Sequence, residues 1–197
     1  MINITNEDNI ELMARYEDNH FDLAIVDPPY GIGISSNPVR QKHAKKDWDN
    51  AIPTKEYFDE LFRVSKNQII WGGNYFDLPP TQGFFIWDKK QPHDFSLAMC
   101  EMAWSSLQKP AKMWTLSVLK ERNKIHTTQK PVQLYEWLLM NNAEQGDKIL
   151  DTHLGSGSIA LACHNLKFDL TACELDTEYY NAAMLRLKQH QQQLTMF

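Results

Sequence analysis

Short apolar runs that end at an acidic residue recur along this chain, and they constrain its fold more than any other feature. The runs end at Asp27 in "DLAIVD", at Asp151 in "DKILD" and at Glu174 in "DLTACELD". A nearly continuous apolar run of this length is typical of a strand buried on both faces of a parallel sheet. Helical patterns such as "TKEYFDELFRVS" alternate with the runs. This order predicts an α/β fold with a mostly parallel sheet.

Two further runs, residues 83–90 and 97–107, lie next to each other in the middle of the chain. They predict neighbouring strands that pair antiparallel. Neither an internal repeat nor a linker interrupts residues 1–197, and this length suffices for one domain with a substantial core. We therefore expect a single domain.

The first apolar run leads directly into "DPPY", and this turn is the most unusual local feature. Proline continues neither a sheet ladder nor a helix interior, so Pro28 and Pro29 stop and stiffen the chain. Asp27 and Tyr30 then place a carboxylate and an aromatic ring on a rigid turn, which predicts a site for a flat ligand. Ligands of such folds bind at the carboxyl edge of the sheet, where Asp27, Asp151 and Glu174 should meet.

A glycine turn follows the strand that ends at Asp151. Gly155 and Gly157 in "ILDTHLGSGSIA" separate this strand from a predicted helix, and Glu174 closes the next strand about 20 residues later. Glycines at this place let a ligand approach the backbone and the helix N-terminus, and the following acid commonly binds ribose hydroxyls. The pattern favours a nucleoside-type ligand over a phosphate-binding loop, because no Gly-Lys-Ser/Thr follows.

Composition excludes some classes of protein. The polar start of the chain does not resemble a secretory signal, and no apolar run reaches the roughly 18 residues of a membrane helix. Cys100, Cys163 and Cys173 lack the spacing of metal ligands, so no metal site is expected. They are interpreted as thiols of a protein in the reducing cytoplasm.

The net charge of −5 argues against a nucleic-acid partner, but the positive charges are clustered. Residues 31–53 form a long predicted loop that we expect to be mobile, and residues 105–130 form a short irregular segment rich in lysine. The two clusters are interpreted either as solvated loops or as a footprint for a polyanion such as DNA. The candidate DNA-binding residues are Arg40, Lys42, Lys45, Lys46, Lys112, Lys120, Arg122 and Lys124.

Taken in order, these motifs resemble the DNA amino-methyltransferases that use S-adenosylmethionine (AdoMet). The likeness is to the class with the catalytic motif first: "DPPY" at 27–30, "HTTQKP" at 126–131, "DTHLGSG" at 151–157 and "CELD" at 173–176. "IIWGGNYF" and "FIWDKK" also look like the small phage-type adenine methylases. The resemblance implies a Rossmann-like methyltransferase fold with a seven-stranded, mostly parallel sheet, an antiparallel hairpin and helices on both faces. It also implies the cytoplasm of a bacterial or phage-infected cell.

The activity that this resemblance implies is methylation of the 6-amino group of adenine in double-stranded DNA. The target base would be flipped out of the duplex. The Asp27 carboxylate and the Pro28 carbonyl would then accept hydrogen bonds from its amine, Pro29 would keep the turn rigid and Tyr30 would stack on the base. One alternative is the 4-amino group of cytosine, and another is a DNA-binding or partner subunit without catalysis. A homodimer is left open.

The resemblance also assigns a cofactor site. It places Glu174 on the ribose of AdoMet and the glycine turn around its amino acid and sulfonium, and it places residues 128–130 near the methionine carboxylate. Thr152 and His153 depart from the Pro-Phe that the family usually has there. Asp8 is as well explained as a helix cap, and His126 as a structural histidine. The candidate cofactor-binding residues are Asp8, His126, Thr128, Gln129, Lys130, Asp151, His153, Gly155, Ser156, Gly157 and Glu174.

Overall fold

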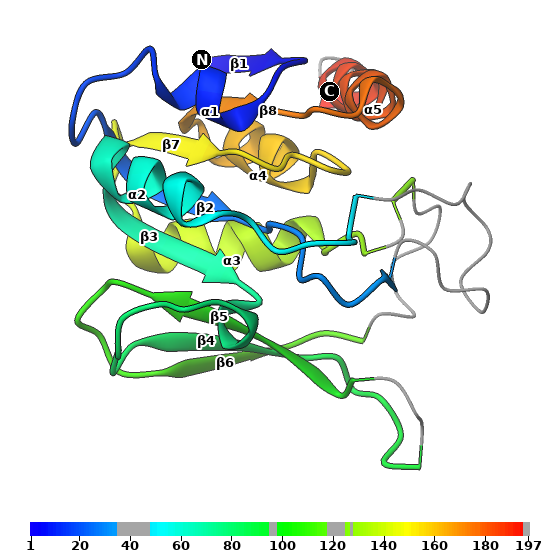
Figure 1. Cartoon of the computed structure of the whole chain (residues 1–197). Coiled ribbons are helices and arrows are strands. Elements are labelled where there is room, and N and C mark those ends of the chain that lie inside the picture. The colour runs from blue at the N-terminus through cyan, green and yellow to red at the C-terminus, as the bar shows by residue number, and fades with distance from the viewer. Residues whose placement is uncertain (35–47, 95–97, 118–124, 127, 195–197) are drawn as a thin grey trace.

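One mixed sheet with helices on both faces makes up the computed structural model (Figure 1), which describes residues 1–34, 48–94, 98–117, 125–126 and 128–194. The strands are β1 (Ile2–Thr5), β2 (Phe21–Val26), β3 (Ser65–Trp71), β4 (Phe84–Asp88), β5 (Cys100–Ser105), β6 (Lys112–Thr115), β7 (Lys148–Asp151) and β8 (Asp169–Cys173). The helices are α1 (Asn9–Met13), α2 (Lys55–Val64), the 3-10 turn η3 (Gly73–Tyr75), α3 (Val132–Asn142), α4 (Ser158–Leu166) and α5 (Thr177–Leu194).

The strands follow the order β1-β8-β7-β2-β3-β5-β4-β6 across the sheet. The first five are parallel to one another, while β5 pairs antiparallel with both β3 and β4. The predicted mostly parallel sheet with an antiparallel pair is thus confirmed. The antiparallel direction of β5 has a consequence for the site, because its amino end reaches the edge at which the other strands end (Figure 1).

The predicted count of seven strands is wrong, because the described residues form eight. The additional strand is β6, which pairs parallel with β4 inside the segment expected to be irregular. Its four residues carry little apolar pattern of their own. Tertiary contacts stabilise it instead: the Trp114 ring stacks near Trp137 of α3, and the Trp87 indole donates to the Leu116 carbonyl just beyond the strand at 2.9 Å.

The helices divide between two hydrophobic layers on opposite faces of the sheet. Alternate residues of β2, Leu23 and Ile25 on one side and Ala24 and Val26 on the other, contribute to the two layers. The first layer also contains α3, α4 and α5, and the second contains α1 and α2. Both faces of the central strands are therefore buried, which explains their continuous apolar sequences.

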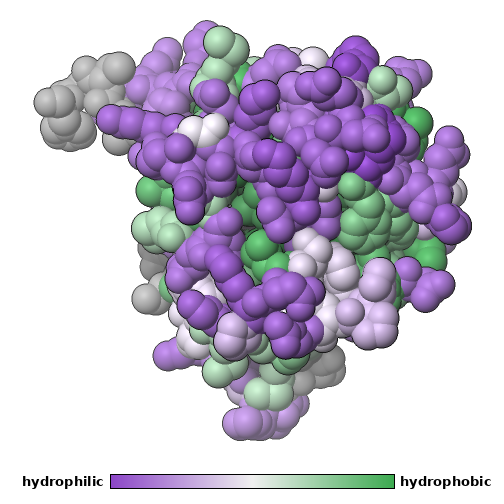
Figure 2. All heavy atoms as spheres, turned by 90° about the vertical axis from the view of Figure 1, so that its left-hand side faces the viewer, coloured by the Kyte–Doolittle hydropathy of each residue, from purple (hydrophilic) through white to green (hydrophobic). Residues whose placement is uncertain are grey.

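The two edges of the molecule differ in character. Hydrophilic side chains predominate on the face at the amino ends of the parallel strands, with smaller hydrophobic areas between them (Figure 2). The opposite edge carries the loops that follow the carboxyl ends, including the turn after β2 (Figure 1). No helix in the described part of the chain is long and apolar enough to span a membrane.

Candidate active site

Asp27 directly follows β2, and the turn after it is held by contacts on both sides. The Tyr30 hydroxyl donates a hydrogen bond of 2.7 Å to Asp27 Oδ1. The Tyr30 ring stacks on Tyr75 with 5.0 Å between ring centroids. Gly72, with a φ of +70°, lets this ring lie against the backbone, since a Cβ there would stand 2.2 Å from a ring carbon. The turn therefore has one defined conformation.

Asp49 anchors the same turn from the far end of the loop. Its side chain is fully buried. Its Oδ1 accepts the backbone N–H groups of Tyr30 and Gly31 at 2.8 and 2.9 Å, and its Oδ2 accepts that of Ile34 at 2.7 Å. Three charge-assisted bonds to one carboxylate tie the segment after the prolines to residue 49.

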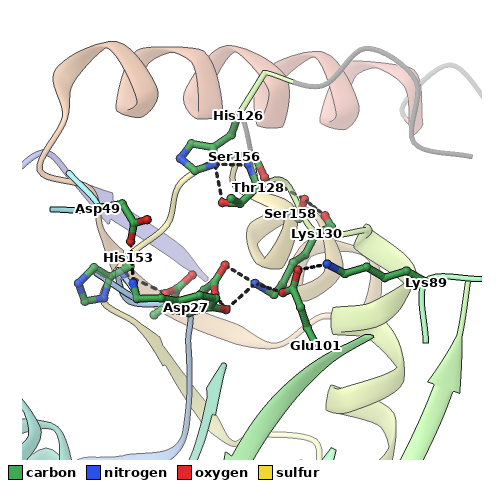
Figure 3. A network of polar contacts seen from close by, with 12 residues as sticks. Asp27, Asp49, Lys89, Glu101, His126, Thr128, Lys130, His153, Ser156 and Ser158 are labelled. Carbon is green, nitrogen blue, oxygen red and sulfur yellow. Dashed lines mark hydrogen bonds and ion pairs between the residues drawn. The ribbon is translucent and has the colours of Figure 1, made fainter. Parts of the chain in front are cut away.

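Lys130 connects the half-buried Asp27 to a second half-buried carboxylate, Glu101 (Figure 3). Its ammonium lies 2.5 Å from Asp27 Oδ2, 3.1 Å from Glu101 Oε2 and 3.3 Å from the Tyr30 hydroxyl. Three acceptors match the three N–H bonds of an ammonium. The other oxygen of Glu101 pairs with Lys89, which follows β4. The row Lys89, Glu101, Lys130 and Asp27 alternates in charge.

The electrostatics of this row follow from its burial and its alternating charges. Burial raises the pKa of Asp27, and Glu101 adds to this, although Lys130 opposes both. Burial also disfavours ionised Glu101, but Lys130 and Lys89 outweigh it and hold the pKa of Glu101 at about 2. Burial disfavours charged Lys130, yet Asp27 and Glu101 outweigh it and raise its pKa. Lys130 is thus a firmly charged group shared by two carboxylates.

Two cavities open at the carboxyl edge and share a wall. One has a volume of about 370 Å³ and lies over the glycine turn, and the other, of about 440 Å³, lies over the "DPPY" turn. The residues that line both are Asp27, Trp48, Thr128 and Lys130. A reactive group bound in one cavity would therefore meet a ligand of the other beside Asp27. Among the described residues, no group of three or more His, Cys, Asp or Glu side chains could hold a metal ion.

Most of the candidate cofactor residues line the first cavity. These are His126, Thr128, Gln129, Lys130, His153, Gly155, Ser156 and Glu174. Asp8, Asp151 and Gly157 do not line it. Asp8 instead caps α1 by accepting the Ile10 N–H at 2.8 Å, which is the alternative that the sequence left open. Gly157, with a φ of +71°, packs against Ala183 of α5, so its position serves helix packing.

Glu174 and the glycine turn are joined directly. One oxygen of Glu174 accepts the Gly155 N–H at 2.8 Å, and the other accepts the Asp176 N–H at 2.9 Å. The Ser158 hydroxyl, at the start of α4, donates to the Lys130 carbonyl at 2.7 Å. Segments far apart in sequence are in this way fixed around one cavity.

His153, which stands where the family usually has phenylalanine, packs as an aromatic ring and also forms hydrogen bonds. Its ring lies edge-on to Tyr57 at 5.2 Å, its Nδ1 lies 3.0 Å from the Thr152 hydroxyl, and its Nε2 lies 3.2 Å from Asn9 Nδ2. Burial lowers the pKa of His153 to about 3, so the ring is neutral at physiological pH. Since an amide nitrogen only donates, Nε2 is the acceptor of the Asn9 contact.

Asp151 is buried at the end of β7, directly before residues 152–156, which line this cavity. Its Oδ1 accepts the His153 N–H at 3.0 Å. Burial raises the pKa of Asp151 to about 8, with Asp27 and Glu174 adding to the rise. A buried carboxyl that holds its proton at neutral pH would ionise when a cation enters nearby.

Sequence reasoning missed three of the charged residues at this site: Asp49, Lys89 and Glu101. Glu101 offered a signal, since it interrupts the apolar strand "LAMCEMAW". Lys89 and Asp49 lie among other charged residues, in "WDKK" and "KKDWDN", and nothing in those letters distinguishes them. Lys130 was predicted near the cofactor carboxylate, and its ammonium contacts Asp27, Glu101 and the Tyr30 hydroxyl.

The predicted DNA-binding residues are mostly beyond what the structure describes. Lys112 is described: it is exposed and begins β6. The residues outside the described ranges are Arg40, Lys42, Lys45, Lys46, Lys120, Arg122 and Lys124. Part of the segment 31–53 also lies outside the described residues, so its expected mobility stays a prediction.

Relatives of this chain are type II methyltransferases. Methyltransferase M.HpaI of Haemophilus parainfluenzae, a type II enzyme, is 25% identical over 90% of this chain and 71% of its own length. Type II methyltransferase M2.MboI of Moraxella bovis is 22% identical over 93% of this chain and 86% of its own length.

Solved structures share the fold. The M1.HpyAVI–SAM complex matches with a TM-score of 0.64 and 22% identity, covering 95% of this chain and all of that one. The cytosine-N4-specific PvuII DNA methyltransferase matches with a TM-score of 0.64 and 15% identity, covering 94% of this chain and 86% of that one. The sequence model of the N6/N4 DNA methylase family matches residues 86–185, half of the chain, a range that includes Lys130 and the glycine turn but not Asp27. The chain therefore belongs to the N6/N4 DNA methylase family.

Proposed function

We propose that this chain transfers the methyl group of AdoMet to the 6-amino group of adenine in double-stranded DNA. The observation that carries the proposal is the position of Asp27, on the wall shared by two cavities. One cavity would hold the cofactor and the other the flipped base. The target amine would then lie next to Asp27 and face the cofactor.

The first cavity fits AdoMet in its chemistry. Glu174 ends β8, where an acid commonly binds ribose hydroxyls, and aromatic rings of Trp48, His126 and Tyr179 lie around the cavity. The buried carboxyl of Asp151, which precedes the lining residue Thr152, favours a positively charged ligand. We assign His126, Thr128, Gln129, His153, Gly155, Ser156 and Glu174 to this cofactor.

Catalysis by the chain consists of holding the amine. When bound, AdoMet supplies an electrophilic methyl on a sulfonium. The amine of a base is a weak nucleophile because its lone pair is delocalised into the ring. Asp27 and the Pro28 carbonyl accept its two hydrogen bonds and hold the nitrogen so that its lone pair faces the methyl. No N–H or O–H of the described residues donates to that carbonyl, so it can accept from the substrate.

The second cavity supplies surfaces for a flat base. Tyr30 and Tyr75, stacked on each other, both line it, and Tyr75 is 43% exposed. Stacking of a base on such a ring contributes roughly 1–3 kcal/mol, which offsets part of the cost of base flipping. The basic residues of 39–46 and 105–130 remain our candidates for the phosphate contacts.

The 4-amino group of cytosine is the second candidate, favoured by the fold shared with the cytosine-N4-specific PvuII enzyme. The aspartate of "DPPY" favours adenine, because the cytosine enzymes commonly have serine there. Long-read sequencing that detects modified bases decides between them, with DNA from cells that express the chain or its Asp27→Ala variant. We expect methylated adenine at a defined site only with the parent chain. Unmodified DNA from both strains would refute the proposal.

A partner subunit without catalysis is distinguished by calorimetry. A chain of that kind would bind DNA but not AdoMet, whereas we expect AdoMet to bind the parent chain and the Asp27→Ala variant. The variant separates the two roles, because it removes the carboxylate that would hold the amine and leaves Glu174 and the glycine turn in place.

A further inference from the structure

The ammonium of Lys130 is shared between two carboxylates, and only one of them belongs to the catalytic turn. It lies 2.5 Å from Asp27 and 3.1 Å from Glu101. Lys130 is 3% exposed, so water screens these interactions little. The attraction between Glu101 and the ammonium reduces how strongly the ammonium neutralises Asp27.

Glu101 reaches this position because β5 runs against the other strands. It is the second residue of β5, opposite Trp87 of β4, so it lies near the catalytic edge. Lys89 follows β4 and pairs with the second oxygen of Glu101. Figure 3 shows Lys89, Glu101, Lys130 and Asp27 in one row that leads to the turn.

We propose that Glu101 and Lys89 are positioning residues that set how strongly Lys130 neutralises Asp27, and so how well Asp27 accepts the substrate amine. This rests on the proposed function. Without Glu101, the Lys130 ammonium would pair with Asp27 alone and neutralise it more strongly. The Asp27 carboxylate would then be a weaker hydrogen-bond acceptor. Without Lys89, Glu101 would attract Lys130 more strongly and leave Asp27 less neutralised.

The two substitutions are therefore expected to change Asp27 in opposite directions. The ionisable groups that face Asp27 are Tyr30 on its own turn, Lys130, Glu101 of β5, Tyr135 of α3 and Asp151 of β7. Glu101→Gln removes a negative neighbour, so the pKa of Asp27 should fall. Lys89→Met should raise the pKa of Asp27.

The test is a carbon-13 NMR titration of the Asp27 carboxyl in the cofactor-free chain, in the parent and both variants. Glu60→Gln is the matched control. Glu60 pairs with Arg63 at 2.8 Å and has a similarly exposed side chain, 25% against 22% for Glu101, but lies on α2 away from the site. It should leave the Asp27 titration unchanged.

Methyl transfer gives the second readout. The rate needs ionised Asp27, so the acid limb of kcat should move to lower pH in Glu101→Gln and to higher pH in Lys89→Met. The dissociation constant for AdoMet should stay within about twofold in both, as expected for changes outside its contacts. A residue that only supports the fold would not shift the two limbs in opposite directions.

The outcomes separate this proposal from the proposed function. An Asp27 titration that does not move, or that moves the same way in both variants, overturns the proposal. If Glu101→Gln does not fold, Lys89→Met decides alone, because only a rise in the pKa of Asp27 agrees with the proposal. A parent chain that transfers no methyl refutes the proposed function, while the NMR titration still decides the coupling.

Discussion

Replacing Asp49 by asparagine tests whether the loop anchor controls the catalytic turn. Asp49 Oδ1 accepts two backbone N–H groups and Oδ2 accepts one. An amide keeps one oxygen, so at least one N–H would face a nitrogen donor. An unsatisfied buried donor costs about 1–3 kcal/mol, and each bond that loses its charged acceptor weakens by about 1 kcal/mol.

The local loss is thus about 3–5 kcal/mol for the three bonds together. About 2.7 kcal/mol corresponds to a factor of 100 in rate, so we expect kcat/KM for DNA methylation to fall by about 100-fold or more. Affinity for AdoMet should change little, because Asp49 lines the base cavity and not the cofactor cavity.

The assay measures transfer of labelled methyl groups to DNA, with calorimetry for AdoMet and thermal unfolding for stability. Asp22→Asn is the matched control. Asp22 accepts a hydrogen bond from the Lys148 backbone N–H and forms an ion pair with Lys66. Unlike Asp49, it lies at the amino ends of the strands, away from the site. Its kcat/KM should match the parent. An Asp49→Asn variant with parental kcat/KM, or with AdoMet affinity reduced by the same factor, would refute the reasoning.

Three further substitutions have defined outcomes. Gly72→Ala would place a Cβ 2.2 Å from the Tyr30 ring at a positive φ, so methyl transfer should fall while calorimetry finds AdoMet affinity retained. Asp151 has its pKa raised to about 8, against about 4 unfolded, so its stabilising contribution is complete below pH 4 and lost as pH rises through 8. Asp151→Asn should flatten this decline in urea unfolding between pH 5 and 9, and an unchanged slope would contradict the assignment. His153 has a pKa of about 3 and is therefore neutral both at pH 5.5 and at pH 8. Calorimetry should find that His153→Phe changes the affinity for AdoMet by the same factor at the two pH values. A factor that changes with pH would show that His153 titrates.

Local sequence predicted the parts of the site that are continuous in the chain. Apolar runs identified the buried strands, and the prolines after Asp27 marked a rigid turn. Glu174 followed from its place at the end of a strand after a glycine turn, and it lines the cavity that we assign to the cofactor. These features depend on residues within a few positions of one another.

The rest depends on pairing between distant segments. The four residues of β6 form a strand because β4 and Trp137 provide partners, which no local pattern reveals. Glu101 reaches Lys130 only through the antiparallel direction of β5. Asp49 anchors the turn by accepting the N–H groups of Tyr30 and Gly31, which lie 19 and 18 positions earlier in the chain, so no local pattern reveals it.

Mass spectrometry of nucleosides decides whether Asp27 directs a methyl group to the adenine amine: DNA is incubated with the chain and AdoMet that carries a trideuterated methyl group. We expect the label on the exocyclic amine of adenine, and none with an Asp27→Ala variant that still binds AdoMet. Label on a ring carbon, no labelled nucleoside at all, or full labelling by the variant would contradict it.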